Sequence, residues 1–256
     1  PSYEAWSCAM HMLQWLRQER GRGILFRSDG NKQLIAECDS SNKQDPKDGL
    51  VMYGYVVSLA NAPIVTQSCK LKNIGFGTPA TEYMGMANAI DKGTVDSKLD
   101  ATEGLRISDD QLQDARGMTT RWTGASVIWL RGLLKEVGMD DFIKGPTTVF
   151  SDSSGAIDWM KFRKITPGNN YILLAYHQVG VFSRTGEILP IWKPGRYNCS
   201  DLLTKASTPQ EIQKLLRKFL GYDLVIPEEV QEKLKQHGKW LLSITVFDSS
   251  VLQKSD

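Results

Sequence analysis

The sequence predicts an α/β fold, and two features of its pattern support this prediction. Three consecutive strand-forming segments, 34–39, 51–59 and 63–67, are joined by polar turns, which favours an antiparallel meander. Two later strands, 147–150 and 187–192, are each followed by a predicted helix. Because helices bury their apolar faces against a sheet, we expect one sheet covered by helices.

The helices are predicted from apolar side chains at helical spacing and from signals at the ends of the elements. Thr208 and Glu211 form a capping box, with Pro209 between them at the first helical position. The helices are expected at 3–20, 79–90, 125–137, 156–160, 172–182, 201–204, 209–219 and 228–239. A short strand is also expected at 23–27, and residues 240–246 are compatible with a strand or with no regular structure.

The chain is expected to have three parts. Residues 1–30 form a lead-in helix and strand, residues 31–220 form the main domain, and residues 221–256 form a C-terminal tail. Within the main domain, residues 90–122 are polar and aperiodic, which predicts an inserted surface loop. Because the chain starts directly in a helical segment, we expect it to be part of a longer polyprotein.

Composition excludes several classes of protein. The 256 residues suffice for one large domain or two small ones, and the net charge of +2 does not by itself indicate nucleic acid binding. No apolar run has membrane-spanning length, and the N-terminus has no signal peptide, so we expect neither secretion nor a membrane partner. The cysteines are widely spaced, which disfavours a disulfide framework or a zinc site and indicates a reducing compartment. They are Cys8, Cys38, Cys69 and Cys199.

Four acids stand at the ends of predicted elements. Asp39 follows the first strand, Glu82 lies in the first turns of a helix, Asp152 follows the fourth strand and Asp201 begins a short helix. Neighbouring strands would bring Asp39 and Asp152 together at one edge of the sheet. Each acid also has a plainer interpretation: a turn former, a helix cap or an acid that complements a helix dipole.

A cluster of these acids would favour divalent metal. Crowded carboxylates repel one another, and a bound cation offsets the repulsion. Oxygen ligands without histidine or cysteine select Mg²⁺ or Mn²⁺ over Zn²⁺. Two such ions about 3.5–4 Å apart suit phosphodiester hydrolysis by in-line displacement. Spacing alone does not decide between this chemistry and the plainer interpretations.

Motifs along the chain, in order, resemble the ribonuclease H domain of Ty1/copia-type retrotransposon reverse-transcriptase polyproteins. The resemblance runs from the first residues to about Leu220. The matching segments are His11–Arg17, Gly23–Phe26, Ile35–Asp39, Gly54–Val57, Pro63–Ile64, Thr81–Met84, Ile128–Leu134, Val149–Ile157 and Ser200–Lys205.

This resemblance implies a fold, a site and partners. The fold would be ribonuclease H-like, a five-stranded mixed sheet with an antiparallel three-strand meander plus two parallel strands, flanked by helices. Asp39, Glu82, Asp152 and Asp201 would be the catalytic ligands of two Mg²⁺ or Mn²⁺ ions. The substrate would be the RNA strand of an RNA–DNA hybrid, and the partner would be the reverse-transcriptase portion of the same polyprotein. The expected location is a cytoplasmic virus-like particle or the nucleus.

The sequence departs from the family pattern at several places. Tyr171 and Leu173 replace a histidine and an aspartate, and His177 matches only the second histidine of that motif. This drift favours an alternative, a catalytically decayed domain that binds hybrid or acts as a scaffold. A third interpretation, an integrase-like nuclease, is disfavoured because Glu82 precedes Asp152 in the chain.

Basic residues near the predicted site are candidates for binding phosphates of the nucleic acid. Their alternative role, solvated surface charge, is equally compatible with the sequence. The candidates are Lys161, Arg163, Lys164, Lys193 and Arg196.

Overall fold

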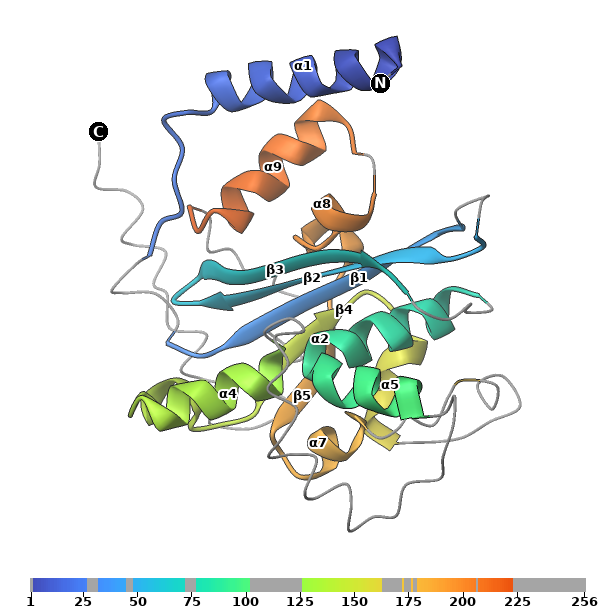
Figure 1. Cartoon of the computed structure of the whole chain (residues 1–256). Helices are drawn as coiled ribbons and strands as arrows, with labels where there is room; N and C mark the ends of the chain where they lie inside the picture. The colour runs from blue at the N-terminus through green and yellow to red at the C-terminus, as the bar shows by residue number, and fades with distance from the viewer. Residues whose placement is uncertain are drawn as a thin grey trace.

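The fold is a single five-stranded mixed sheet with helices on both faces (Figure 1). The computed structural model describes residues 2–26, 32–44, 48–71, 77–101, 126–162, 172, 176, 179–205 and 207–222. The strands are β1 (Ile35–Gln44), β2 (Val51–Leu59), β3 (Ala62–Lys70), β4 (Thr147–Ser151) and β5 (Ile188–Trp192), in the order β3-β2-β1-β4-β5.

Strand directions divide the sheet into two halves. β1, β2 and β3 form the antiparallel meander, and β1, β4 and β5 run parallel to one another. The predicted α/β class, with a five-stranded mixed sheet flanked by helices, is therefore confirmed.

Helices cover the two faces unequally. In Figure 1, α2, α4, α5 and α7 lie on one face of the sheet, and α8 and α9 lie on the other. Their bounds are α1 (Tyr3–Gln18), α2 (Thr78–Ala101), α4 (Val127–Glu136), α5 (Ser154–Phe162), α7 (Val181–Arg184), α8 (Asp201–Thr204) and α9 (Pro209–Phe219), with 3₁₀ turns η1 (Asp140–Ile143) and η2 (Gly195–Tyr197). None of the helices in the described ranges is long and apolar enough to cross a membrane.

The core lies between the sheet and α2. The predicted apolar stripe of α2 is fully buried, at Tyr83, Met86, Ala87 and Ile90. It packs with the inward face of β1, where Ala36 and Cys38 are also buried, as their period-two spacing predicts. A buried α2 is important for the site because it carries Glu82 to the sheet on a rigid support.

Helix α9 confirms the predicted capping box. The Thr208 hydroxyl accepts a hydrogen bond from the backbone N–H of Glu211, and the Glu211 carboxylate accepts one from the backbone N–H of Thr208. The chain then turns at Gly221, whose φ of +85° favours glycine; a Cβ there would lie 2.5 Å from the carbonyl oxygen of Leu25. This close approach joins the lead-in segment to the end of α9.

Two predictions from sequence are wrong. Residues 23–26 form neither strand nor helix. The loop expected from residue 91 begins instead as the second half of α2, which continues to Ala101 beyond a kink at Asp91. Ile90, which the sequence placed both in the apolar stripe and at the first position of the loop, is buried in the core, as the stripe predicts. The remainder of that predicted loop, 102–122, and the predicted elements at 228–239 and 240–246 lie outside the described residues.

Helix α1 exposes the apolar side chains that its spacing predicts to lie on one face. Trp6, Leu13 and Leu16 are each more than half exposed, and α1 has no buried residue. Figure 1 shows α1 beyond α9, away from the sheet. The segment that follows α1 contacts α9, because Arg22 donates a hydrogen bond to Gln213 at 2.9 Å.

Candidate active site

Three acids from separate elements meet at one end of the sheet. Asp39, Glu82 and Asp152 each offer a carboxylate oxygen, and these three oxygens lie within 4.8 Å of one another. Strand pairing explains this arrangement. The last parallel pair of β1 and β4 is Glu37 with Phe150, so Asp39 and Asp152 both lie two residues beyond it. The predicted convergence of these three acids is confirmed.

The sequence predicts Asp39 at the end of the first strand, and this is wrong. Asp39 lies within β1. β1 continues to Gln44 because it stays paired with β2, and Asp39 stands opposite Gly54 in that antiparallel ladder. Only the parallel pairing with β4 stops before Asp39. Asp39 is thus held rigidly by one neighbouring strand, while its other side is open to Asp152.

Burial and repulsion between neighbouring charges perturb Glu82 and Asp152. Asp39 has no exposed surface, and Glu82 is 3% exposed. Burial, with the charges of Asp39 and Asp152, raises the pKa of Glu82 well above its ordinary value, although Glu82 accepts a hydrogen bond from the backbone N–H of Ser40 at 3.2 Å. Burial and the charge of Asp39 also raise the pKa of Asp152. The fold therefore crowds carboxylates at a cost that a bound cation would offset.

The helix-cap interpretation of Asp152 is wrong. The residue that caps α5 is Ser153, whose hydroxyl accepts a hydrogen bond from the backbone N–H of Ala156 at 3.2 Å. Asp152 instead lies against the loop after β5, where a Cβ on Gly195 would be only 2.8 Å from its carboxylate. A glycine at position 195 leaves room for this acid.

Asp201, the fourth predicted acid, joins the cluster through a lysine. The ammonium Nζ of Lys205 lies 2.9 Å from Asp39 Oδ1 and 3.2 Å from Asp201 Oδ1. The hydroxyl of Thr204 also donates to Asp39. Burial, together with the charge of Asp39, raises the pKa of Asp201 to about 7. Asp201 is therefore near enough to interact electrostatically with Asp39. It is not part of the group formed by Asp39, Glu82 and Asp152, whose oxygens lie within 4.8 Å of one another.

A second charge cluster, which the sequence did not predict, lies next to the first. We call it the Glu37 cluster: Glu37, Lys193 and Lys218. Lys193 Nζ lies 2.8 Å and Lys218 Nζ 3.2 Å from Glu37 Oε1, and the backbone N–H of Cys199 donates to Glu37 Oε2 at 2.8 Å. Burial alone would raise the pKa of Glu37, but the two lysines outweigh it and lower this pKa to about 2.

The Glu37 cluster corrects one predicted site residue. Lys193, a candidate for phosphate binding, is 3% exposed; its ammonium pairs with Glu37 and lies 4.9 Å from the centre of the Phe150 ring. Burial lowers the pKa of Lys193 to about 8 against the opposing charge of Glu37. Lys193 therefore neutralises Glu37 in the interior and is not available on the surface to bind nucleic acid.

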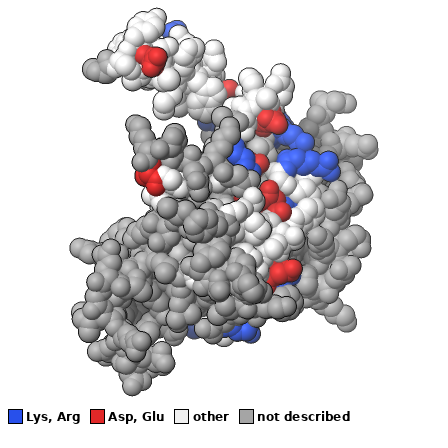
Figure 2. All heavy atoms as spheres, turned by 90° about the vertical axis from the view of Figure 1, so that its right-hand side faces the viewer, with Lys and Arg blue, Asp and Glu red and all other residues white. Residues whose placement is uncertain are grey.

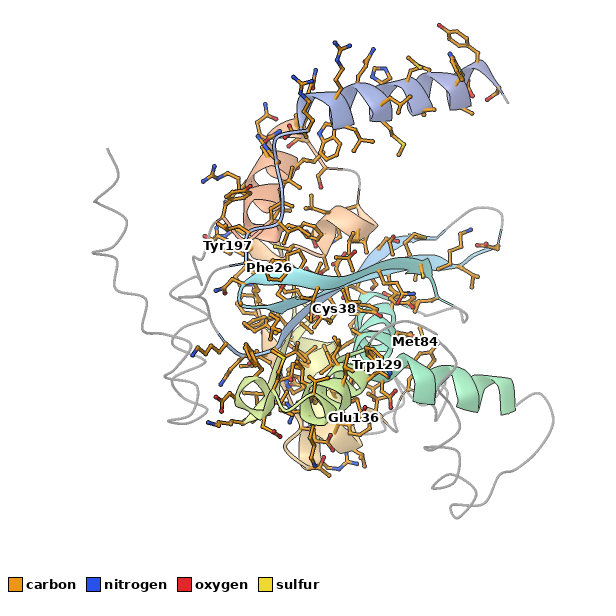
Figure 3. The ribbon with its side chains drawn as sticks, turned by 60° about the vertical axis from the view of Figure 1, so that its left-hand side comes forward. Phe26, Cys38, Met84, Trp129, Glu136 and Tyr197 are labelled. Carbon is orange, nitrogen blue, oxygen red and sulfur yellow. The ribbon has the colours of Figure 1, made fainter. Side chains whose placement is uncertain are left out.

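The Glu37 cluster also fixes the segment that leads to Asp201. Lys218 donates to the carbonyl of Tyr197, and the Asn198 amide donates to the carbonyl of Cys38 at 2.9 Å. In Figure 3, Cys38 lies at the sheet on the side of α2, and Tyr197 lies beyond the sheet near α9. The loop from β5 to α8 is thus bound to β1 immediately before Asp201 and Lys205 in the chain, and these contacts help to position both residues.

The other basic candidates are placed only in part. Arg196 is exposed, and its guanidinium stacks 4.9 Å from the centre of the Tyr197 ring. Lys161 is half-buried, and Arg163 and Lys164 lie outside the described residues. Figure 2, which faces the right-hand side of Figure 1, shows acidic and basic side chains next to one another on the described surface.

Comparison with known proteins agrees with the sequence motifs. The chain resembles part of a retrotransposon Pol polyprotein. It is 21% identical over 219 residues to the "Retrovirus-related Pol polyprotein from transposon RE2" of Arabidopsis thaliana, a match that covers 86% of this chain and 13% of the relative. No protein-family model matches the chain. The resemblance to a retrotransposon polyprotein, drawn above from motifs, is confirmed.

Two solved structures were also found to be similar. One is the N-terminal RNase H domain of a Mycobacterium tuberculosis protein, with a TM-score of 0.38 and 14% identity, covering 72% of this chain and 96% of that one. The other is LC11-RNase H1 in complex with an RNA/DNA hybrid, with a TM-score of 0.38 and 12% identity, covering 72% of this chain and 99% of that one.

The ligand chemistry of the site fits a hard divalent cation. The three closely spaced donors are all carboxylate oxygens, which Mg²⁺ and Mn²⁺ prefer. The thiol of Cys38, the residue before Asp39, donates a hydrogen bond to the carbonyl of Phe150 at 3.2 Å, and burial raises its pKa well above the ordinary value. Asp39, Glu82 and Asp152 are thus suited to hold metal, with Asp201 as a further acid at the margin.

Proposed function

We propose that this chain is a divalent-metal-dependent ribonuclease H domain that hydrolyses the RNA strand of RNA–DNA hybrids. The observation that carries the proposal is the convergence of Asp39, Glu82 and Asp152 at the end of the parallel strands. The relative is a retrovirus-related Pol polyprotein, which supports the same class of nucleic acid chemistry. This chain would be the corresponding portion of such a polyprotein.

The proposed roles follow from where each side chain lies. Asp39, Glu82 and Asp152 would hold Mg²⁺ or Mn²⁺, and Asp201 would complete the ligand set of a second ion. A pair of such ions activates water and stabilises the leaving oxygen in phosphodiester hydrolysis. The rigid sheet and buried α2 fix the carboxylates before substrate arrives, so little reorganisation is needed during the reaction.

Substrate binding would use surface cations and the RNA sugar. The proposed phosphate contacts are Arg196, Lys161, Arg163 and Lys164. Lys193 is not proposed as a phosphate contact, because it is buried. Contacts to the 2′-hydroxyl in the minor groove would distinguish RNA from DNA.

The proposed partner is the reverse-transcriptase portion of the same polyprotein. Helix α1 supports this proposal, because it presents Trp6, Leu13 and Leu16 to solvent. The proposed location is a cytoplasmic virus-like particle or the nucleus.

A second candidate is a decayed domain that binds hybrid without cutting it. The observations that favour it are the replacements at Tyr171 and Leu173, which lie outside the described residues, and the contact of Lys205 with Asp39. Hybrid binding without metal-dependent cleavage would support this candidate.

Incubation of labelled hybrid with the full chain tests the proposal. With Mg²⁺ we expect cleavage of the RNA strand, and with a chelator we expect none. Asp39→Asn should reduce the rate by about 10²–10³, the usual loss when one preorganised charge is removed from an active site. The matched control is Asp158→Asn, an exposed acid on α5, which should cleave at the wild-type rate. Equal rates in the two variants would exclude Asp39 from catalysis.

A further inference from the structure

Lys205 places a positive charge inside the acidic site. It directly follows α8, and its ammonium contacts both Asp39, at 2.9 Å, and Asp201, at 3.2 Å. Asp39 is completely buried, whereas the Lys205 side chain is 37% exposed. The Lys205 side chain therefore extends from the protein surface to the buried Asp39. Lys205 belongs to the same short segment as Asp201.

The position of this ammonium is the one that a bridging ion would need. A divalent ion shared by Asp39 and Asp201 would bind their oxygens at about 2.0–2.1 Å. The ammonium already lies between these two carboxylates, and the Thr204 hydroxyl engages the second oxygen of Asp39. Lys205 and an ion at that place cannot both contact Asp39 Oδ1.

The two halves of the acidic site differ in this respect. The Asp39–Glu82–Asp152 half has three carboxylate oxygens within 4.8 Å of one another. The Asp39–Asp201 half has its charge offset by the ammonium. Because Lys205 reaches solvent, it has room to leave the site, as a fully buried lysine would not.

We infer that Lys205 is a built-in cation of the Asp39–Asp201 half of the site, which competes with a second divalent ion. This inference rests on the metal-binding role proposed for the carboxylates. In the protein without metal, Lys205 offsets the charge of Asp39 and Asp201. The first ion binds at Asp39, Glu82 and Asp152 with Lys205 in place, and the second binds only when Lys205 withdraws. Lys205 thus sets the metal concentration at which the complete site forms.

Titration of the full chain with Mn²⁺ tests this inference. Free Mn²⁺ is measured by electron paramagnetic resonance, so that both the number of bound ions and their affinities are obtained. For the wild type we expect one stronger and one weaker ion. For Lys205→Met we expect the second ion to bind at least tenfold more tightly, because its competitor is gone. Lys205→Arg, which keeps the charge, should retain the weak second ion.

A matched control removes the lysine of a lysine–aspartate ion pair elsewhere in the chain. Lys144 lies 2.6 Å from Asp141 on the exposed 3₁₀ turn η1, and Lys144→Met should bind Mn²⁺ as the wild type does. Thermal unfolding gives a second readout. Without metal, Lys205→Met should melt below the wild type, and Mn²⁺ should raise its melting temperature by more. If Lys205→Met fails to fold, the neutral variant Lys205→Gln is titrated against the same expectations.

The outcomes separate this inference from the proposed function. Equal number and affinity of Mn²⁺ ions in the wild type and Lys205→Met would overturn the role of Lys205, and Mg²⁺-dependent cleavage by the wild type would still uphold the nuclease. Binding of no Mn²⁺ by either protein would overturn both. Tighter binding of a second ion by Lys205→Met would support the built-in cation even if the protein cleaves no hybrid.

Discussion

Glu37 and Asp39 stand two residues apart on β1 and have opposite surroundings. Glu37 faces two lysines and a backbone N–H, so one negative charge meets two positive ones. Asp39 faces Glu82, Asp152 and Asp201, with Lys205 as its ion-pair partner. The lysines of the first cluster lower the pKa of Glu37 to about 2, whereas burial and neighbouring charge raise the pKa of Asp201 to about 7.

This difference separates a structural charge cluster from the one proposed to bind metal. In the Glu37 cluster, the fold supplies every counter-charge, and the result is to hold the loop before α8 against β1. In the Asp39 cluster, the fold assembles more negative charge than it neutralises. Burying several carboxylates together costs free energy because they repel one another. On the same strand, the charge of Glu37 is fully compensated by lysines. The contrast indicates that the Asp39 cluster takes its remaining positive charge, a cation, from solution.

The largest expected effect comes from breaking the satisfied cluster. Glu37→Gln would leave the ammonium groups of Lys193 and Lys218 without their acid, and Lys193 is almost completely buried. We expect a loss of about 3 kcal/mol in the free energy of unfolding, measured by denaturant titration. The control is Glu136→Gln, an exposed acid on α4, which should change stability little. Adding Lys193→Met to Glu37→Gln should restore part of the loss; a further decrease would contradict this account.

The next effect concerns Asp201, the acid at the margin of the site. Asp201→Asn keeps the shape of the side chain and removes its charge. If Asp201 is a metal ligand, Mg²⁺-dependent cleavage should fall about a hundredfold or more, which corresponds to about 3 kcal/mol of transition-state stabilisation. Metal-free stability should hold or rise, because repulsion by Asp39 is relieved. Unchanged cleavage would leave Asp39, Glu82 and Asp152 to carry the chemistry.

The two clusters should also respond to pH in opposite directions. Because the pKa of Glu37 falls from 4.5 to about 2 on folding, its contribution to stability is complete above about pH 4.5 and is lost as the pH falls toward 2. The pKa of Asp201 rises from 3.8 to about 7, so the folded state binds that proton more tightly. Metal-free stability should therefore decrease as the pH rises from about 4 to about 7, and then level off.

Unfolding midpoints measured in a chelator across this pH range test the comparison. Asp201→Asn should make the decrease between about pH 4 and 7 shallower and leave the acid limb below pH 4.5 unchanged. An equal slope in the wild type and in Asp201→Asn would show that burial and the charge of Asp39 do not raise the pKa of Asp201 in the folded protein.

The smallest expected effect distinguishes an exposed cation from a buried one. Arg196→Ala should weaken hybrid binding about equally for all sequences, and it should reduce the slope of log affinity against log salt by about 1, as expected for one lost phosphate contact. Lys193→Met should leave this slope unchanged, because Lys193 pairs with Glu37 in the interior. A reduced slope for Lys193→Met would show that Lys193 contacts a phosphate of the hybrid and would contradict its assignment to the interior.

Local pattern determined much of the fold. Strands β2, β4 and β5 begin and end within a few residues of their predicted bounds, and the stripe of α2 is buried as its spacing requires. The capping box at Thr208 forms as predicted. These features depend on neighbours within a few residues along the chain, so one sequence contains the signal. The acids Asp39, Glu82 and Asp152 were found for the same reason, since the local pattern places each at or near the end of a predicted element, although β1 in fact continues past Asp39.

Only the tertiary structure decided how the charges are grouped. Pairing with β2 carries β1 past Asp39 to Gln44, and no local signal in this polar segment indicates such an extension. Lys193 stands in a basic turn typical of a surface, yet β1 and β4 supply Glu37 and the Phe150 ring that surround it. Lys205 belongs to a sequence motif, but its contact with Asp39 spans 166 residues. Propensity and periodicity act over a few residues, whereas the charge that surrounds a buried side chain is set by strand pairing between distant parts of the chain.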